Sequence, residues 1–406
     1  MLRCPQPHEP ALLQVEFENS SFEPDPEQPG IFRYHDWLPA GRTLPHGGRT
    51  VVYYSKALNR TAALSNLWVA YNGYWPERGG FLETTTFKEL EAWAVMARLP
   101  EAHDGIMVVA SAGNTAAAFA SACSVNQVPC LIILPEVGLP HLQFTERLHP
   151  CVKIVSLVGF TDYSDAITLS NRVSQLDGFF PEGGVANVGR RAGLGTTLLS
   201  AVETIGRLPD YYFQAVGSGA GGIGVHEAAR HLIRDGRFGS RFPRLMLSQN
   251  LPFVPLYSSW TAGRRELVKI EPEDGRRQIQ QIAAHVLSNR QPPYSIRGGL
   301  FDVLTESKGQ MLAADNLETL PRLQLFEELE GIDIDPASAV AFTTLLKAAR
   351  SGLLEPDDLV LLNVTGGGRH RRQTERKLVP ARPALQIDQA EILLDETPAK
   401  IANLFR

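Results

Sequence analysis

The sequence of 406 residues has few cysteines and no long hydrophobic run, and these two absences exclude several classes of protein. Its four cysteines lie far apart and form no CxxC pair, so we expect reduced thiols, a cytoplasmic location and no cysteine-rich metal site. No apolar stretch approaches the ~20 residues that cross a bilayer. Residues 1–18 lack the charged-then-apolar pattern of a secretory signal. We therefore expect neither a membrane protein nor a secreted one.

The chain also lacks an excess of basic residues. Its 39 Lys and Arg against 44 Asp and Glu give a formal net charge of -5 and a pI near 6.1. Such a chain has no net positive field that attracts a nucleic-acid backbone or an anionic membrane. Hydrophobic residues make up 44% and charged residues 20%, which is ordinary for a globular protein of two or three domains. We expect its partners to be small molecules.

From about residue 105 the sequence alternates between short apolar runs and amphipathic runs. The apolar runs are continuous, which is typical of strands in a parallel sheet that is covered on both faces. Expected strands lie within 105–111, 130–136, 152–159, 211–216, 244–250 and 358–364, with helices at 115–125 and 223–236. This alternation predicts an α/β fold. Residues 1–50, rich in Pro, Gly and acidic residues, predict an irregular N-terminal wrap.

The stretch GSGAGGIG, residues 217–224, follows an apolar strand and opens a helix. Glycines let the backbone approach an anion, and a helix N-terminus supplies free N–H groups, so we predict a phosphate cradle. Gly217, Gly219 and Gly222 also match the GxGxxG pattern of dinucleotide sites, which requires an acidic residue at the end of the next strand. That strand ends in Gln249 and Asn250. A phosphate outside a dinucleotide is therefore favoured, with a bare structural turn as the alternative.

Two further strand ends carry polar loops. In VASAGNTAAAF, Ser111, Asn114 and Thr115 offer N–H groups and short polar side chains that suit a carboxylate, although an ordinary N-cap also explains them. In NVTGGG, Thr365 presents a hydroxyl group, again with a simple turn as the alternative. Ligands of open α/β sheets bind outside the carboxyl ends of the strands. We therefore expect these loops to meet at one site.

Lys88 lies in TTTFKEL, at the start of the helical run ELEAWAVMARL. Most lysines are solvated surface charges. A lysine together with three polar strand ends is better explained by a cofactor that has one phosphate, one aldehyde and one aromatic ring nitrogen, which is pyridoxal phosphate. Phe87 is expected to shield the amine from water, which lowers its pKa and favours the neutral form that acts as a base.

These motifs carry a family resemblance. TFKELEA, SAGNT, GSGAGG and NVTGGG, in this order, resemble the fold-type II pyridoxal-phosphate enzymes of the threonine synthase group. YNGYWPERGGF, DYYFQAVGSGAGGI and NRQPPYSIRGGLFDVL resemble more closely the cysteate synthases within that group. The resemblance covers about residues 30 to 370 and implies a tryptophan synthase β-like fold, with two parallel-sheet domains and the active site in the cleft between them.

The resemblance implies three units and, by analogy, a homodimer. The expected units are an N-terminal wrap (1–50), a large cofactor-binding domain (51–100 and 206–406) and a smaller substrate-loop domain (101–205). Many relatives begin with a CxxC element that resembles a zinc ribbon, whereas this chain keeps only Cys4, so no metal is expected there.

The resemblance also implies a role for each motif. Lys88 is expected to bind the cofactor aldehyde and to act as the catalytic base, Asn114 to contact the ring oxygen, and Thr365 to face the ring nitrogen. The phosphate is expected at Gly217, Ser218, Gly219, Ala220, Gly221 and Gly222. The substrate is expected at Thr85, Ser111, Ala112, Gly113, Asn114, Thr115, Arg190 and Arg191. The two arginines are chosen because a guanidinium fork fits phosphate or sulfonate, although a pair of solvated arginines is the alternative.

The reaction that the resemblance implies is O-phospho-L-serine plus sulfite giving L-cysteate and phosphate, a step that feeds coenzyme M biosynthesis. A hydroxyl at Thr365 does not enforce a charged pyridinium, so the cofactor is a weaker electron sink that suits β-elimination and replacement. Two alternatives stay open. One is threonine synthase, or another β-replacement enzyme or lyase with a different nucleophile. The other is a non-catalytic nucleotide-binding module that keeps the fold.

Overall fold

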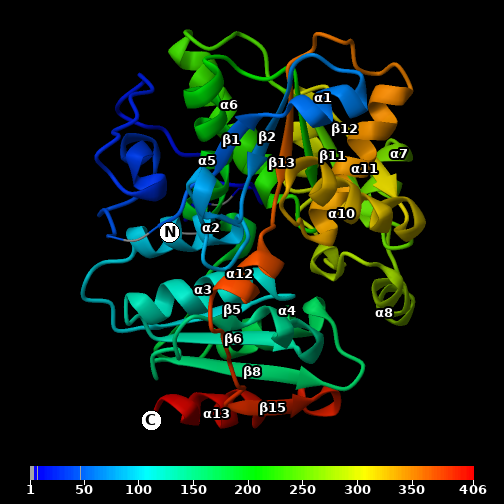
Figure 1. The fold of residues 1–406 in the computed structure, drawn as a ribbon. Coiled ribbons are helices and arrows are strands. Elements are labelled where there is room, and N and C mark those ends of the chain that lie inside the picture. Colours follow the sequence, from blue (N-terminus) through cyan, green and yellow to red (C-terminus); the bar gives the residue numbers. More distant parts are fainter. Residues whose placement is uncertain (1–3, 7, 46) are drawn as a thin grey trace.

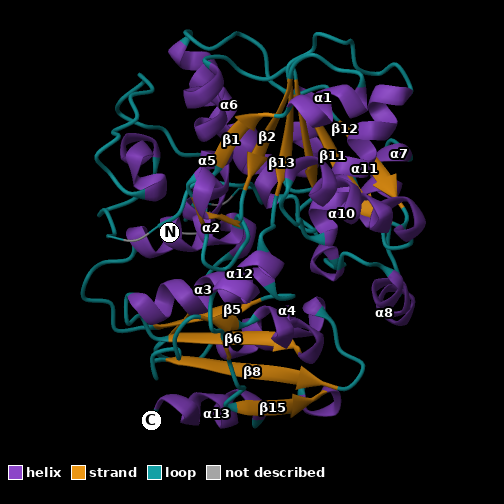
Figure 2. Cartoon of the chain, in the orientation of Figure 1, coloured by secondary structure: helices purple, strands orange, loops and turns teal. Residues whose placement is uncertain are grey.

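The computed structural model of the protein describes residues 4–6, 8–45 and 47–406. Within these ranges the fold is organised by two sheets, the larger drawn in the upper half of Figure 1 and the smaller in the lower half. The larger sheet has the order β1-β2-β13-β10-β11-β12, and the smaller has the order β15-β8-β6-β5-β9. Only β1, among these strands, runs antiparallel to its neighbour. The prediction of an α/β fold with parallel sheets is confirmed, and Figure 2 shows the helices around both sheets.

The strands of the larger sheet are β1 (Val51–Tyr54), β2 (Leu67–Tyr71), β10 (Tyr211–Ala215), β11 (Arg244–Asn250), β12 (Gln310–Ala314) and β13 (Val360–Val364). The strands of the smaller sheet are β5 (Ile106–Ala110), β6 (Cys130–Pro135), β8 (Val152–Val158), β9 (Phe179–Pro181) and β15 (Leu385–Asp388). Two short ribbons pair β3 (Tyr74–Trp75) with β4 (Gly80–Phe81) and β7 (Gln143–Phe144) with β14 (Val379–Pro380).

Helices cover both faces of the larger sheet. Successive strand residues point to opposite faces, so Phe213 and Leu362 pack in one core while their neighbours Tyr212 and Leu361 pack in another. The first core contains side chains of α1 (Lys56–Ala62), α10 (Asn316–Glu330) and α11 (Pro336–Arg350). The second contains side chains of α5 (Val188–Ile205), α6 (Ala220–Asp235), α7 (Pro255–Thr261) and α9 (Leu300–Glu306). This double covering explains why the strands are continuously apolar.

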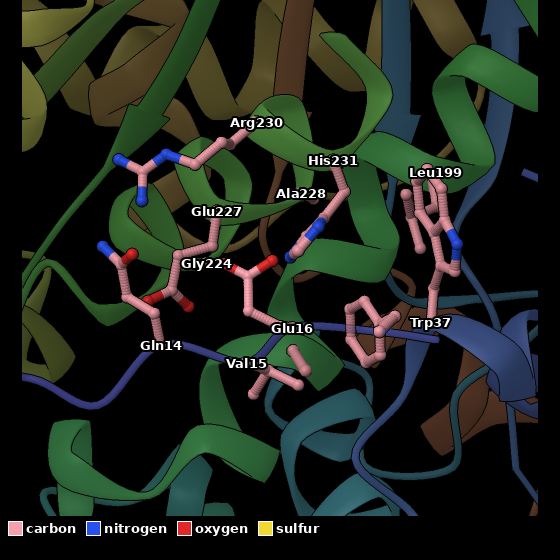
Figure 3. A pocket seen from close by; sticks show the side chains of 12 residues that line it. Gln14, Val15, Glu16, Trp37, Leu199, Gly224, Glu227, Ala228, Arg230 and His231 are labelled. Carbon is pink, nitrogen blue, oxygen red and sulfur yellow. The ribbon is translucent and has the colours of Figure 1, made fainter. Parts of the chain in front are cut away.

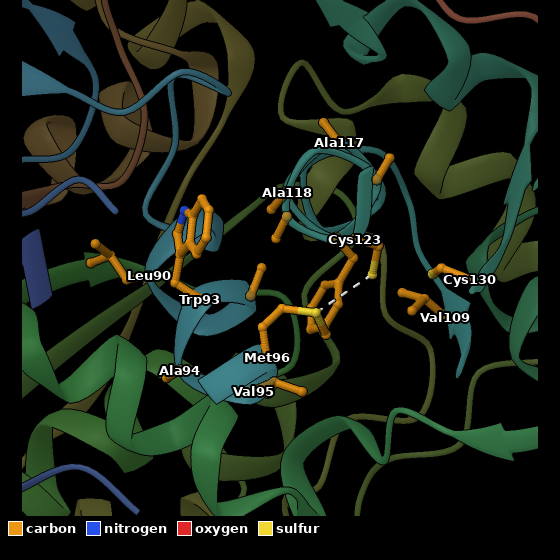
Figure 4. Close-up of a cluster of buried hydrophobic side chains, with 14 of the residues drawn as sticks. Leu90, Trp93, Ala94, Val95, Met96, Val109, Ala117, Ala118, Cys123 and Cys130 are labelled. Carbon is orange, nitrogen blue, oxygen red and sulfur yellow. Dashed lines mark hydrogen bonds between the residues drawn. The ribbon is translucent and has the colours of Figure 1, made fainter. Parts of the chain in front are cut away.

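The smaller sheet is covered in the same way. One face packs against α2 (Lys88–Arg98) and α3 (Asn114–Val125), with Trp93, Met96 and Cys123 in a shared core drawn in Figure 4. The other face packs against α4 (Tyr163–Val173) and α13 (Thr397–Ala402). The exposed α8 (Pro272–Gln281) and the short α12 (Arg369–Glu375) complete the α-helices of the described residues. Because α2 packs against both α3 and α5, it joins the two halves of the molecule.

The chain crosses between the two halves at places that differ from the expected boundaries. The range 206–406 was expected in the larger domain, but β15 pairs in parallel with β8, and Ile387 and Ile401 enter the core of the smaller sheet. The range 101–205 was expected in the smaller domain, but Leu198 and Val202 of α5 pack in the core of the larger sheet. The range 51–100 was expected in the larger domain, but Trp93 and Met96 of α2 pack in the core of the smaller sheet. The expected boundaries are wrong at these three places because contacts between distant segments, which local pattern does not encode, decide them.

The N-terminal segment lies against α5 and α6 and contains a 3-10 helix, η1 (Gly30–Trp37), as its longest regular element. Residues 1–3, 7 and 46 of the predicted wrap lie outside the described residues. Short 3-10 segments elsewhere are η2 (Pro76–Arg78), η3 (Glu136–His141), η4 (Gly184–Ala186), η5 (His285–Leu287), η6 (Gln389–Glu391) and η7 (Asn403–Phe405). Over the described ranges, none of the helices combines the length and the apolar composition needed to cross a membrane.

The position of β15 leads to a stability prediction. We expect Ile387→Ala to lower the free energy of unfolding by about 2 to 5 kcal/mol, because Ile387 is fully buried in the core of the smaller sheet. The exposed neighbour Gln386 is the control, and Gln386→Ala is expected to change stability by less than about 0.5 kcal/mol. Urea unfolding measures both, and equal stability of the two variants contradicts the assignment of β15.

Candidate active site

A cleft of about 680 Å³, counting the solvent at its mouth, lies where strands of both sheets end. From the larger sheet, β10 and β13 deliver the glycine loop and Thr365, and from the smaller sheet β5 delivers the loop that starts at Ser111. Predicted site residues that line the cleft are Lys88, Ser111, Ala112, Gly113, Asn114, Thr115, Arg190, Gly217, Ser218, Gly219, Ala220, Gly221 and Thr365. The structure therefore brings together four motifs that are far apart in the sequence.

The glycine loop connects β10, which ends at Ala215, to α6, which begins at Ala220. The N–H groups in the first turn of α6 have no carbonyl partner within the helix, so they can bind an anion, which the positive end of the helix dipole also favours. Gly219 has a φ of 81°, and a Cβ atom there would lie 2.9 Å from Leu300 Cδ2. The loop thus needs glycine at this position and leaves backbone donors at the cleft.

The loop after β5 is held in place by its own hydrogen bonds. Ser111 Oγ accepts hydrogen bonds from the N–H groups of Gly113 at 3.0 Å and Ala116 at 2.8 Å, so it caps α3. Gly113 has a φ of 150°, and a Cβ atom there would lie 2.8 Å from the ring of His141. Asn114 Oδ1 is buried without a hydrogen-bond partner, although the residue lines the cleft. This oxygen is therefore available to accept a hydrogen bond from a group bound in the cleft.

Lys88 is positioned by contacts between its own loop and the end of β13. The Phe87 N–H donates to the Thr365 carbonyl oxygen at 2.9 Å, and the Gly367 N–H donates to the Thr85 carbonyl oxygen at 3.0 Å. Thr365 Oγ1 lies 3.4 Å from Ser338 Oγ. These bonds place the first residue of α2 and the Thr365 hydroxyl on the same wall of the cleft.

Burial changes the acid–base behaviour of Lys88. Its side chain is 19% exposed, and Nζ lies 5.1 Å from the centre of the Phe87 ring. Desolvation lowers the pKa of the Lys88 ammonium, Arg190 lowers it further, and Glu91 opposes the change. The lowered direction agrees with the expectation from the sequence, and the shielding by Phe87 stays a prediction. A lysine of this kind is available as a base closer to neutral pH than an exposed one.

Buried carboxylates surround the two cationic groups that line the described part of the cleft. Glu91 Oε2 lies 3.2 Å from Lys88 Nζ, and Glu91 Oε1 lies 3.4 Å from Arg190 Nη1. The other side of Arg190 is held by Glu182, whose Oε1 accepts from Nε at 2.9 Å. Burial works against the charge of Arg190, but the two carboxylates raise its pKa above the usual value. Arg190 is therefore a charged but already paired residue.

Three predicted site residues lie outside the set that lines the cleft. Arg191 is fully buried on another side of α5, where its guanidinium binds Glu227 and two backbone carbonyls. Glu227 borders a separate cavity of about 510 Å³ between the N-terminal segment and α5 and α6, shown in Figure 3. Gly222 packs against Leu247. The backbone carbonyl of Thr85 accepts a hydrogen bond from the Gly367 N–H group. The expectation that Arg191 faces the substrate is therefore wrong, because adjacent helical residues point in different directions.

Phe87, which was expected to shield the amine, also lines the cleft. The lining residues that were not predicted are Tyr163, Gln214, Ala215, Val216, Val286, Leu287, Asn289 and Ala337. Gln214, Ala215 and Val216 directly precede the glycine loop, and this position was the signal that could have found them. Tyr163 and Asn289 are each next to one partner of an ion pair, in which Arg290 Nε lies 2.6 Å from Asp162 Oδ2. This pair connects the start of α4 with the segment before α9, so it links the two halves beside the cleft.

The lowered pKa of Lys88 leads to a pH prediction. Without a bound ligand, the amine is expected to be deprotonated, and so reactive, between its lowered pKa and the ~10.4 of an ordinary lysine. Competitive labelling with a small amine reagent over a pH series, read by peptide mass, measures this. Identical pH profiles for Lys88 and the exposed lysines contradict the burial argument.

Comparison with known proteins identifies the family. Residues 45–366 match the family model "Pyridoxal-phosphate dependent enzyme". The cysteate synthase of Methanosarcina acetivorans is 46% identical over 371 residues, 91% of this chain and 89% of that protein. The cysteate synthase of Methanosarcina mazei is 45% identical over 387 residues, 95% of this chain and 93% of that protein.

Solved structures agree with the fold. Maize serine racemase matches with a TM-score of 0.61 at 16% identity, and the match covers 80% of this chain and 91% of the racemase chain. Threonine deaminase isoform 2 from Solanum lycopersicum matches with a TM-score of 0.59 at 14% identity, and the match covers 91% of this chain and 98% of the deaminase chain. The fold-type II assignment is thus confirmed. Together with the lysine, the glycine loop and the polar strand ends of the cleft, these similarities show that the chain belongs to the pyridoxal-phosphate dependent enzymes and, within them, to the cysteate synthase family.

Proposed function

We propose that the enzyme converts O-phospho-L-serine and sulfite to L-cysteate and phosphate. The observation that carries this proposal is identity of about 45% with cysteate synthases along nearly the whole chain, with every cofactor motif of the family gathered at one cleft. When bound, pyridoxal phosphate supplies the electron sink that makes the α-proton of an amino acid acidic. The protein's own residues then provide binding, orientation and proton transfer.

The residues of the cleft fit this cofactor. Lys88 is the amine for the aldehyde, and the backbone N–H groups from Gly217 to Gly221 suit the phosphate. Asn114 has a buried side-chain oxygen without a partner in the described structure, which a ligand in the cleft can satisfy through a donated hydrogen bond. Thr365 offers a neutral hydroxyl group for the ring nitrogen. These assignments are the ones that the family resemblance implies, and the positions of the residues at the cleft support them.

Lys88 Nζ is the group proposed to take the α-proton, because its lowered pKa leaves it deprotonated more readily than an exposed lysine. The substrate carboxylate is assigned to the N-terminus of α3, from Ala112 to Thr115. In the balanced reaction the bond from the β-carbon to the phosphate oxygen breaks, and the sulfur of sulfite forms the new bond to that carbon. Phosphate carries away the electron pair of the broken bond.

We infer that Arg190 contributes less to binding the substrate oxyanions than the sequence analysis expected. It lines the cleft as expected, but Glu182 and Glu91 already compensate its charge. A paired guanidinium attracts phosphate or sulfite less strongly than a free one. We therefore propose that the helix N-termini and hydroxyl groups of the cleft share the binding of both oxyanions with Arg190.

We also propose that the enzyme acts in the cytoplasm as a homodimer. The four cysteines are free thiols, as is usual in a reducing compartment. The dimer rests on analogy with enzymes of the same fold type. Sedimentation of the purified protein tests the dimer directly.

Product analysis tests the proposed reaction. The holoenzyme is incubated with O-phospho-L-serine and, separately, sulfite, sulfide or a primary amine, and the amino acid formed is identified by mass. We expect L-cysteate with sulfite, one phosphate released per cysteate, and no product from Lys88→Ala. Phosphate release from phosphoserine without any nucleophile indicates a lyase, and release from O-phosphohomoserine indicates a threonine synthase. Either result, without cysteate formation, overturns the proposal.

A further inference from the structure

Glu91 is a buried carboxylate that contacts three residues of the cleft lining, and the sequence motifs assign it no role. It lies one helical turn after Lys88 on α2 and is fully buried. Its two oxygens have different partners. Oε1 accepts a hydrogen bond from Thr115 Oγ1 at 3.0 Å and lies 3.4 Å from Arg190 Nη1, whereas Oε2 lies 3.2 Å from Lys88 Nζ.

These partners come from three elements. Thr115 is in the first turn of α3, Arg190 is in the first turn of α5, and Lys88 begins α2. Arg190 is itself held by Glu182, which follows β9. The contacts to Thr115 and Arg190 fix the orientation of the carboxylate without help from the lysine. Oε2 therefore points at Nζ whether or not the lysine is engaged elsewhere.

Burial makes this arrangement costly unless the charges are paired. An unpaired buried carboxylate is strongly destabilising, whereas two cations and two carboxylates in contact compensate one another. Glu182 and Arg190 form one pair, and Glu91 and Lys88 form the other. When Lys88 binds an aldehyde, Glu91 keeps Arg190 and Thr115. When Lys88 is released and takes a proton, Glu91 Oε2 can pair with the ammonium that forms.

On the basis of the proposed function, we propose that Glu91 is the positioning residue for Lys88. It orients Nζ in the cleft while the amine is free of the cofactor, and it stabilises the ammonium that forms when Nζ takes the α-proton, next to the loop that binds the substrate carboxylate. The proton that Nζ takes from the α-carbon then stays on Nζ beside the substrate and returns to the α-carbon after the new carbon–sulfur bond has formed. Because Glu91 also binds Thr115, the same carboxylate links the position of the base to the position of that loop.

The neighbouring Glu89 shows that burial on α2 alone does not give this role. Glu89 is also buried, but its Oε2 accepts hydrogen bonds from the N–H and hydroxyl groups of Thr84, at 2.8 and 2.9 Å. It stabilises the loop before the helix and makes no ion pair with Lys88 in the described structure. Glu89→Gln is therefore a matched control for Glu91→Gln, with the same helix, residue type and burial.

Several charged groups influence the amine together. Desolvation and Arg190 lower the pKa of Lys88, while Glu91 on its own helix and Glu182 across the cleft raise it. Tyr163 at the start of α4 faces the same cluster, and burial keeps its phenol neutral by raising its pKa. Loss of the Glu91 charge removes an opposing influence and leaves Arg190 less compensated. Both changes lower the pKa of Lys88 further.

Amine labelling of the cofactor-free, full-length protein tests the pairing. In Glu91→Gln the midpoint of Lys88 labelling is expected to move to lower pH by about one unit, the shift that loss of an adjacent opposite charge produces. Glu89→Gln is expected to keep the wild-type midpoint. Glu91→Asp, with its shorter carboxylate, gives a smaller shift in the same direction and replaces Glu91→Gln if that variant does not fold. An unchanged midpoint in the folded Glu91 variants overturns the proposal.

Kinetics of the holoenzyme test the functional consequence. Glu91→Gln is expected to lower kcat by about tenfold or more while changing the KM for phosphoserine by less than about threefold, the pattern of a lost interaction in the reacting complex. Equal kcat in Glu91→Gln and wild type overturns the positioning role. A failure of the proposed reaction is distinguishable, because the wild-type enzyme then forms no cysteate even where the labelling midpoint shifts.

Discussion

The active cleft depends on compensation between buried charges. Lys88 and Arg190 bring two cations to a place with little solvent, and Glu91 and Glu182 bring two carboxylates that make this tolerable. Glu91 lies on α2, Arg190 on α5 and Glu182 after β9, so the arrangement exists only when these three segments are packed together. The same pairing that stabilises the cleft also decides how the lysine behaves, because burial favours the neutral amine and Glu91 favours the ammonium.

The fold explains why these groups meet. Parallel strands deliver their carboxyl ends to one edge of each sheet, and the two edges face each other across the cleft. The larger sheet contributes the glycine loop and Thr365, whose carbonyl group binds the loop that precedes Lys88. The smaller sheet contributes the loop from Ser111 to Thr115. The ion pair between Arg290 and Asp162 joins the two halves at the cleft, and β15 returns the chain to the smaller sheet.

Local pattern was sufficient to predict six strands of the two sheets, the helices α2, α3 and α6 and most of the motifs, but not strands such as β2 and β12. A buried parallel strand is continuously apolar, and a phosphate-binding turn needs glycines before a helix, so both features are visible in a short window. Lys88, Asn114 and Thr365 were found in this way, with the help of the family resemblance.

Features that depend on distant partners were not predicted. The two arginines of NVGRRAG look equivalent in sequence, but only Arg190 faces the cleft, and Arg191 lies on another face of α5 with Glu227. The pairing of Glu91 with Thr115 and the pairing of β15 with β8 join segments far apart in the chain. Ser111, which looked like a ligand for the substrate, has its oxygen engaged as the cap of α3.

The central claim is that Lys88, held in this cleft, is the residue that carries the cofactor. Reduction of the holoenzyme with borohydride, followed by proteolysis and peptide mass analysis, tests it most directly. The account predicts a single modified peptide with the pyridoxyl phosphate mass on Lys88, and loss of the visible cofactor absorbance in Lys88→Ala. A modification on another lysine, or full cofactor absorbance in that variant, contradicts the account.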